Sequence, residues 1–248
     1  MAVSSYQYVV WFPLSSSLSS TKKKWKLEAA SGSTEEIRVC TNRSCRRQGS
    51  VQTLQVIKDI SPPNISVNSC GCLGRCGAGP NVVRLPQGII VGHCSTATSA
   101  ARVTVGQDDA AIRKALDALA LRNKAQAEID QGNFYQAELL LSQAINHKPF
   151  SGLHTTYKCR SLVRLAMGNY TGALEDAQEA LNLSPQYLEA YMCEGDAFME
   201  MEQYDAAEKS YSMCLQIDPT VRRSKSFKTR VSKLQERLIA ASMSHNQQ

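Results

Sequence analysis

The 248-residue sequence lacks a long hydrophobic run. Its longest apolar candidate near the N-terminus, Val9 to Leu14, is interrupted by Pro13, and no stretch approaches the roughly 18 residues that suggest a membrane-spanning helix. Flavin and dinucleotide motifs are also missing, so an enzyme is the less expected class, and any redox catalysis would need a second protein. Hydrophobic residues at 43% and charged residues at 20% exclude a wholly disordered, collagen-like or coiled-coil chain.

Acidic residues are absent from Met1 to Leu27, where serines and a cluster of four lysines (Lys22, Lys23, Lys24 and Lys26) are found instead. This composition is typical of an organellar transit peptide, and the hydroxyl-rich Met-Ala start favours a plastid. We therefore expect residues 1–30 to be a disordered transit peptide and the protein to work in the chloroplast, in the stroma. The alternative is an ordinary disordered tail.

Charge is distributed unevenly along the chain. Residues 36–105 contain eight basic and two acidic residues (+6), residues 106–221 nine basic and seventeen acidic (−8), and residues 222–248 seven basic and one acidic (+6). Such a difference in net charge between segments indicates which partners each segment can attract, and does not indicate the fold. The acidic segment is expected to favour a basic partner or the chain's own basic segments.

Six of the nine cysteines lie within 55 residues: Cys40, Cys45, Cys70, Cys72, Cys76 and Cys94. Around them the pattern predicts a strand at 36–39, a helix at 51–60, a strand at 65–67, a glycine-rich loop and a hairpin of 82–85 with 89–91. This is a thioredoxin-like α/β outline. The spacing C-x4-C, 26 residues, C-x3-C selects Cys40, Cys45, Cys72 and Cys76 as metal ligands. Four thiolates suit a [2Fe-2S] cluster, and the adjacent glycines let backbone amides approach it.

The run Cys72-Leu-Gly-Arg-Cys76-Gly, with Pro80 beyond it, resembles the thioredoxin-like [2Fe-2S] ferredoxins. The resemblance covers residues 36–105 and implies that fold and a two-iron cluster. Zinc remains an alternative, although structural zinc sites favour C-x2-C pairs, and so does a thiol or disulfide redox role. If Cys70 were the ligand instead of Cys72, the second pair would read C-x5-C and would depart from the pattern of the resemblance, so we prefer Cys72. Cys94 is expected to be a small buried apolar residue.

Residues 108–221 contain an internal repeat. Pro149, Pro185 and Pro219 are spaced by 36 and 34 residues, and Ala137, Ala173 and Ala207 show the same two spacings. The sequence resembles three tetratricopeptide (TPR) repeats, at 118–149, 154–185 and 188–219, which implies an all-α solenoid that binds a protein partner. Residues 222–242 are expected to cap the stack, with 243–248 as a tail.

TPR domains that hold acidic chaperone C-termini use a Lys, Asn and Arg constellation on the concave face. The matching positions here are Arg122, Gln126, Cys159, Glu189 and Cys193. Only Arg122 is compatible, so we expect no chaperone clamp of this kind. The basic run from Arg222 to Lys233 is expected to be the solvated face of the capping helix, and no nucleic-acid partner is expected.

Together these patterns predict an α/β thioredoxin-like ferredoxin domain followed by an all-α TPR solenoid. The expected function is that of a plastid iron-sulfur protein whose TPR scaffold holds a partner, as a redox or assembly factor for photosynthetic or iron-sulfur complexes. Two alternatives stay open. One is an electron-transfer component fed by a ferredoxin-type donor, and the other is a zinc-stabilised TPR scaffold without redox chemistry.

Overall fold

The computed structural model describes residues 35–149 and 151–245, with side chains to residue 243. All of these residues belong to one compact unit, Ser33–Gln248. The predicted transit peptide, residues 1–30, lies outside the described residues, as do residues 246–248 of the predicted tail. Within the described ranges, no helix is both long and apolar enough to cross a membrane.

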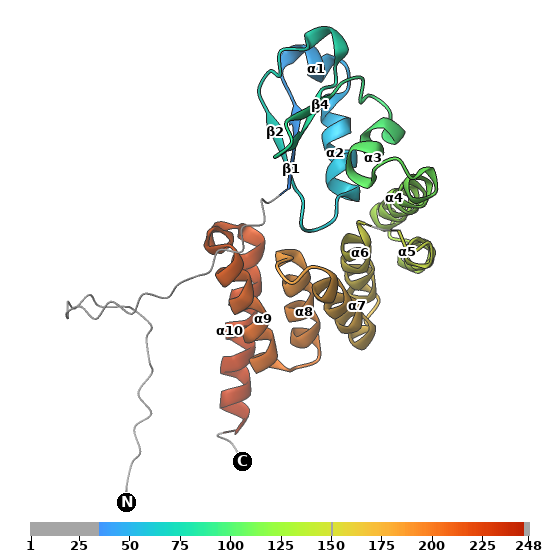
Figure 1. Ribbon diagram of the computed structural model, residues 1–248. Coiled ribbons are helices and arrows are strands. Elements are labelled where there is room, and N and C mark those ends of the chain that lie inside the picture. The colour runs from blue at the N-terminus through green and yellow to red at the C-terminus, as the bar shows by residue number, and fades with distance from the viewer. Residues whose placement is uncertain (1–34, 150, 246–248) are drawn as a thin grey trace, which may run out of the picture. The chain divides into compact units, whose positions relative to one another are not determined.

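The N-terminal part is a small mixed sheet with helices. Its elements are β1 (Glu36–Cys40), α1 (Arg43–Arg47), α2 (Ser50–Ile60), β2 (Ser66–Cys70), η1 (Cys76–Ala78), β3 (Val82–Leu85), β4 (Ile89–Val91) and α3 (Ala97–Val105) (Figure 1). The strand order is β2-β1-β3-β4, with β1 parallel to β2 and antiparallel to β3. This sheet confirms the α/β part of the predicted outline.

The core of this part lies between the sheet and the helices α2 and α3. Ile37 and Val39 of β1 are fully buried against Ile57 of α2 and Ala100 of α3. The α2 segment is helical because its apolar residues recur at helical spacing, and Gly49, with φ +91°, lets the chain turn into it. These contacts fix the end of β1, and with it the first cysteine, against the helical layer.

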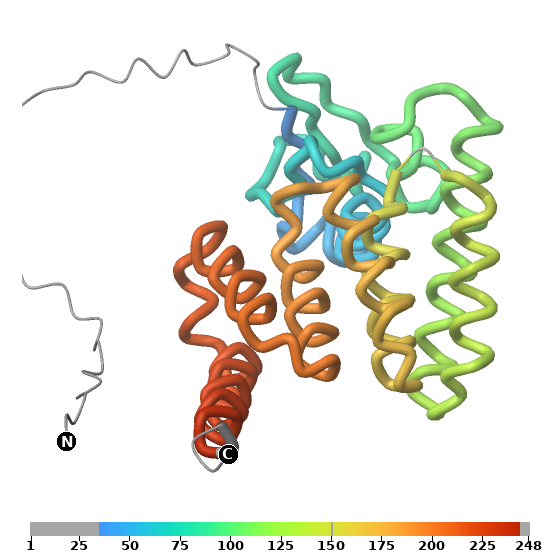
Figure 2. Tube along the Cα trace, turned by 90° about the horizontal axis from the view of Figure 1, so that it is seen from below, coloured from blue at the N-terminus to red at the C-terminus, as the bar shows by residue number. Residues whose placement is uncertain are grey.

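Residues 109–245 form a helical solenoid. Its elements are α4 (Asp109–Asp130), α5 (Phe134–Asn146), α6 (Leu153–Ala166), α7 (Tyr170–Leu183), α8 (Leu188–Glu200), α9 (Tyr204–Ile217), η2 (Pro219–Arg223) and α10 (Lys225–His245). Each helix packs on the next, and Figure 2 shows them side by side as successive pairs. Ala137, Ala173 and Ala207 are fully buried, because only a small side chain fits where the paired helices touch. The predicted solenoid is thus confirmed.

Helix α4 differs from the expected arrangement. The predicted first repeat begins at residue 118, whereas α4 begins at Asp109 and runs unbroken over 22 residues. The physical reason is that neither glycine nor proline occurs between Asp108, which caps the helix, and Asp130. The first repeat is therefore continuous with the segment that leaves the sheet.

The three turns within the helix pairs share a left-handed residue. Gly132 has φ +82° and Gly168 φ +78°, whereas the third turn places Glu202 at φ +60°. A residue with a Cβ pays about 1–2 kcal/mol to adopt this backbone conformation, and glycine does not. Glycine, however, loses more conformational entropy on folding, which offsets about 0.5–1 kcal/mol of that gain. We expect Glu202→Gly to raise the free energy of unfolding by up to about 1 kcal/mol, measured by urea denaturation.

The matched control is Glu208→Gly, because Glu208 is exposed inside helix α9. Glycine there should lower the free energy of unfolding by about 1 kcal/mol. If both substitutions destabilised the protein equally, the backbone conformation of residue 202 would not be the cause.

Candidate functional site

The four predicted ligands lie at one end of the sheet, but in two different environments. Cys40, at the end of β1, and Cys45, in α1, are each 1% exposed. Cys72 and Cys76 lie on the loop that follows β2 and are exposed. Their Sγ atoms are 3.5 Å apart. The structure thus brings Cys72 into contact with Cys76 and buries Cys40 and Cys45, which lie close enough to each other that, in addition to burial, Cys45 contributes to raising the pKa of Cys40.

The loop geometry affects the two exposed thiols differently. The backbone N–H of Gly74 donates to Cys72 Sγ at 3.4 Å and, together with the Cys76 thiol, lowers the pKa of Cys72. The pKa of Cys76 is raised, first by its hydrogen bond with Cys72 and then by the other nearby thiols. Burial raises the pKa of Cys40. The site therefore presents one accessible thiol that ionises more readily than its neighbours.

Cys70 and Cys94 have different surroundings. Cys70 is half-buried at the end of β2, directly opposite Cys40 in the ladder, and burial raises its pKa. Cys94 is fully buried, and burial raises its pKa to about 11. Thr53 donates to the Cys94 backbone oxygen at 2.7 Å. Cys94 is therefore part of the packed core.

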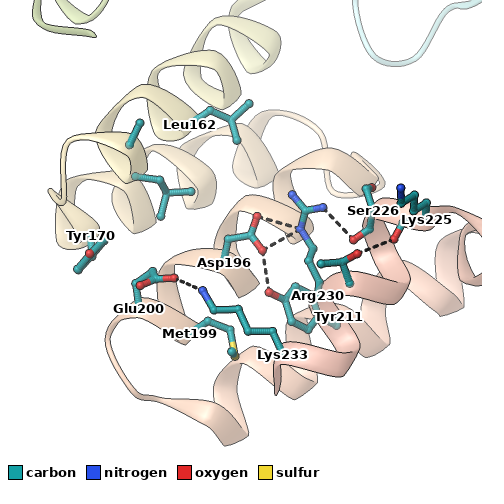
Figure 3. Close-up of a pocket in the computed structure, with 13 residues that line it drawn as sticks. Leu162, Tyr170, Asp196, Met199, Glu200, Tyr211, Lys225, Ser226, Arg230 and Lys233 are labelled. Atoms are coloured by element: carbon teal, nitrogen blue, oxygen red, sulfur yellow. Dashed lines mark hydrogen bonds and ion pairs between the residues drawn. The ribbon is translucent and has the colours of Figure 1, made fainter. Parts of the chain in front are cut away.

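A groove of about 860 Å³ lies in the solenoid between α6, α8 and α10 (Figure 3). Its apolar lining includes Leu162, Leu165 and Met199, and Leu162 is 40% exposed. Its charged lining consists of three cations and two carboxylates: Lys225, Arg230, Lys233, Asp196 and Glu200. We call these residues the C-terminal groove. It combines an exposed apolar surface with one excess positive charge.

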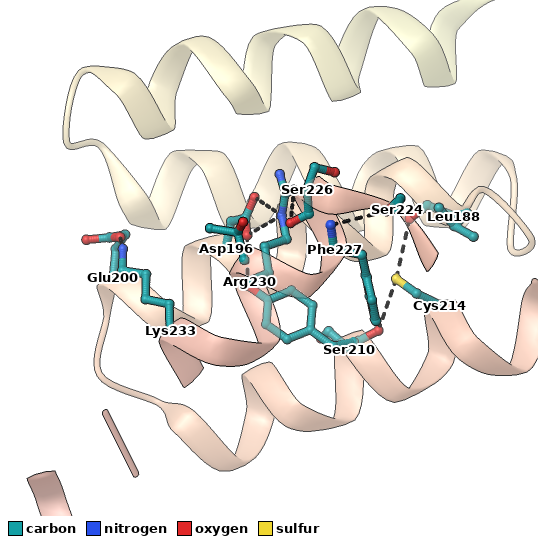
Figure 4. A network of polar contacts seen from close by, with 12 residues as sticks. Leu188, Asp196, Glu200, Ser210, Cys214, Ser224, Ser226, Phe227, Arg230 and Lys233 are labelled. Atoms are coloured by element: carbon teal, nitrogen blue, oxygen red, sulfur yellow. Dashed lines mark hydrogen bonds and ion pairs between the residues drawn. The ribbon is translucent and has the colours of Figure 1, made fainter. Parts of the chain in front are cut away.

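Both carboxylates of the C-terminal groove are neutralised by α10 (Figure 4). Arg230 Nε donates to the two Asp196 oxygens at 2.8 and 2.9 Å, and Tyr211 Oη donates to Asp196 at 2.7 Å. Lys233 Nζ lies 2.6 Å from Glu200 Oε1. Lys225 has no ion-pair partner among the described residues. It is the groove cation left available for a ligand.

The expectation that the basic run of α10 is only a solvated face is therefore wrong for Arg230 and Lys233. Their partners lie on α8, 34 and 33 residues earlier. That separation is about one repeat length, so comparing α8 with the segment one repeat later could have indicated the pairing. The chain's basic C-terminal segment thus neutralises part of its own acidic solenoid.

The five positions matched to a chaperone clamp are only partly exposed. Arg122 is buried and contacts the α/β part, because its Nη2 lies 3.3 Å from the Asp59 carboxylate. Its Nη1 donates to the backbone oxygen of Gly152, just before α6, at 3.4 Å. Gln126 donates to Asp130 at 2.9 Å, and Cys193 is buried. Arg122 therefore joins the first repeat to helix α2.

Comparison with known proteins places the similarity in the solenoid. The tetratricopeptide repeat family model matches residues 188–221. A STIP1 homolog of Dictyostelium discoideum is 32% identical over 99 residues, which is 40% of this chain and 17% of that protein. An SGT1 homolog of Oryza sativa subsp. japonica is 32% identical over 93 residues, covering 38% of this chain and 25% of that protein. The chain thus spans a quarter or less of these curated relatives.

Among solved structures, the first TPR of Spaghetti (RPAP3) bound to the HSP90 peptide SRMEEVD has a TM-score of 0.45 and 20% identity. It covers 50% of this chain and 94% of that one. The second TPR domain of human RPAP3, in complex with the HSP70 peptide SGPTIEEVD, has a TM-score of 0.44 and 19% identity. It covers 49% of this chain and 98% of that one.

The prediction of a [2Fe-2S] redox protein is corrected by these findings. The curated relatives are a STIP1 and an SGT1 homolog rather than iron-sulfur proteins. In the part of the chain that the structure describes, no group of three or more His, Cys, Asp or Glu side chains is arranged to hold a metal ion. The prediction of a [2Fe-2S] cluster is therefore wrong, and the expected ferredoxin-type electron donor loses its basis with it, whereas the choice of Cys40, Cys45, Cys72 and Cys76 as ligands stays a prediction.

The expectation of no chaperone clamp is corrected to this extent: TPR domains among the matches were solved with HSP90 and HSP70 peptides, and binding of such a peptide by this chain is a proposal. The broader prediction of a TPR scaffold is confirmed. Residues 188–221, which include α8 and α9, are a tetratricopeptide repeat within a helical solenoid.

Proposed function

We propose that this protein is a TPR adaptor of the co-chaperone type, which binds an extended acidic peptide of a chaperone in the C-terminal groove. The observation that carries the proposal is the groove's lining. Exposed apolar side chains of α6 lie across from the unpaired cation Lys225 of α10. The similarity to STIP1 and SGT1 homologs supports the same class of function.

The chemistry of the groove selects its ligand. An extended peptide can place an apolar side chain against Leu162 and Leu165 and a carboxylate near Lys225. Because Arg230 and Lys233 already hold Asp196 and Glu200, a second carboxylate meets no repulsion from an unneutralised acid of the groove. A peptide with acidic residues beside an apolar one, such as SRMEEVD, matches this pattern.

The α/β part enters the proposal only through its fold. The order β2-β1-β3-β4, with one parallel pair, supports the interpretation of residues 36–105 as a thioredoxin-like module. Location in the chloroplast stays a prediction from residues 1–30.

Reversing the charge of Lys225 tests the groove. We expect Lys225→Glu to weaken binding of fluorescein-labelled SRMEEVD about three- to tenfold, because a rim cation is lost and a repulsive carboxylate gained. Fluorescence polarisation of the full chain at low and physiological salt measures the effect. The wild-type affinity should fall as salt rises, since exposed charges are screened over about 8–10 Å.

Lys228→Glu is the matched control, because Lys228 lies one turn further along α10 and does not line the C-terminal groove. It should change the affinity less than twofold. Equal effects of the two variants, or binding of SRMEEVD that neither variant nor salt alters, would rule out this groove as the peptide site. Leu162→Asp, at an exposed apolar position, should also reduce binding.

A further inference from the structure

Two exposed thiols touch each other on the loop between β2 and β3. Cys72 Sγ and Cys76 Sγ are 3.5 Å apart, and a disulfide requires about 2.05 Å. Space around the loop allows this approach, since a Cβ added at Gly71, Gly74 or Gly77 would meet no atom within 4 Å. The two thiols can therefore approach without displacing packed side chains.

The other cysteines of the module are less suitable for this reaction. Cys40, Cys45 and Cys94 are at most 1% exposed, so a dissolved reagent cannot reach them in the folded protein. Cys70 is half-buried in the ladder beside β1. Among the thiols of the α/β part, Cys72 and Cys76 are the exposed pair.

The surface next to the pair is basic. Ser44 of α1 donates to the Cys76 backbone oxygen at 3.1 Å, which ties the loop to that helix. Helix α1 also carries Arg43, Arg46 and Arg47, which with Thr41 line a shallow pocket of about 490 Å³. In the described part of the chain, these arginines form no ion pair. An anionic reagent is therefore attracted to the side of the loop that faces α1.

We propose that Cys72 and Cys76 form a reversible intramolecular disulfide by exchange with an anionic small-molecule disulfide of the glutathione type. One thiol loses its proton and attacks a sulfur of the reagent. This breaks the reagent's S–S bond and releases one glutathione thiol. The second thiol then loses its proton and attacks the mixed disulfide, which forms the Cys72–Cys76 bond and releases the second glutathione. The protein pair is oxidised by two electrons, and the reagent is reduced to two thiols.

Peptide mapping tests the proposal on the full chain. The reduced protein is treated with glutathione disulfide, alkylated and digested with trypsin, which cleaves after Arg75, between the two cysteines. We expect peptides 59–75 and 76–84 to remain joined until a reductant is added. Cys72→Ser should abolish the cross-link, and Cys76→Ser should accumulate a glutathione adduct on Cys72. Cys70→Ser, the matched control, should leave the cross-link intact.

A second comparison tests the arginines. Arg43→Gln/Arg47→Gln should slow the reaction with glutathione disulfide about three- to tenfold at low salt, but not the reaction with cationic cystamine. The proposal is overturned if Cys72 and Cys76 stay fully alkylatable after treatment, or if the cross-link persists in Cys72→Ser and disappears in Cys70→Ser. Equal slowing with both reagents would overturn the selectivity for an anion.

Discussion

Replacing Asp176 by asparagine is expected to lower the free energy of unfolding by about 3–5 kcal/mol. The Asp176 side chain on α7 is 3% exposed and lies between two guanidinium groups of α6. Arg160 donates to its two oxygens at 2.7 and 2.9 Å, and Arg164 Nη1 lies 3.1 Å from Oδ2. Asparagine keeps the shape but removes the charge, so Arg160 loses its ion-pair partner and Arg164 loses one of its two.

Urea denaturation followed by circular dichroism measures this effect. Glu175→Gln is the matched control, because Glu175 is the preceding residue of α7 and is exposed. Its free energy of unfolding should change by less than about 0.5 kcal/mol. If Asp176→Asn changed stability no more than the control, Glu138, which also binds Arg164, would be sufficient to compensate the second repeat.

Gly195→Ala is expected to lower the free energy of unfolding by about 1–3 kcal/mol, although alanine is the better helix former. A Cβ at this position of α8 would contact the Tyr211 ring at Cε1 and would lie 2.7 Å from Cδ1 and 2.9 Å from Cζ. Tyr211 is 3% exposed, stacks edge-on against Phe227 and donates to Asp196. The ring cannot move without disturbing both contacts.

The same substitution in a Tyr211→Leu background separates the clash from other causes. Leucine removes most of the ring, so Gly195→Ala should lower the free energy of unfolding of the Tyr211→Leu protein only slightly, or raise it. Thermal unfolding of the wild type, both single variants and the double variant measures the coupling. An equal loss in both backgrounds would show that the close approach of α8 and α9 is not what requires glycine.

The regular part of the fold could be predicted from the sequence because it repeats. The spacing of Ala137, Ala173 and Ala207 indicates which residues lie between paired helices, and each is fully buried. What the spacing does not contain is the contact between different elements. Arg230 pairs with Asp196 across 34 residues, and a basic run shows only that a helix is charged, not which acid it faces.

The cysteine spacing had the same weakness. The choice of Cys40, Cys45, Cys72 and Cys76 as one ligand set stays a prediction, and the spacing does not show which of these side chains are exposed. Here Cys40 and Cys45 are buried in β1 and α1, whereas Cys72 and Cys76 lie exposed on a loop. Burial depends on the packing of α2 and α3 on the sheet, and the spacing carries no information about that packing.

The junction at Arg122 affects how the solenoid opens. In a linear array each repeat is stabilised only by its neighbours, so an uncovered end frays first. Helix α4 packs Ile112 and Leu119 against Ile60 of α2 and Ala101 of α3, while Ser151 donates to the Ile60 oxygen. The first repeat therefore cannot unfold locally by itself, because its unfolding would also expose apolar side chains of α2 and α3 to solvent.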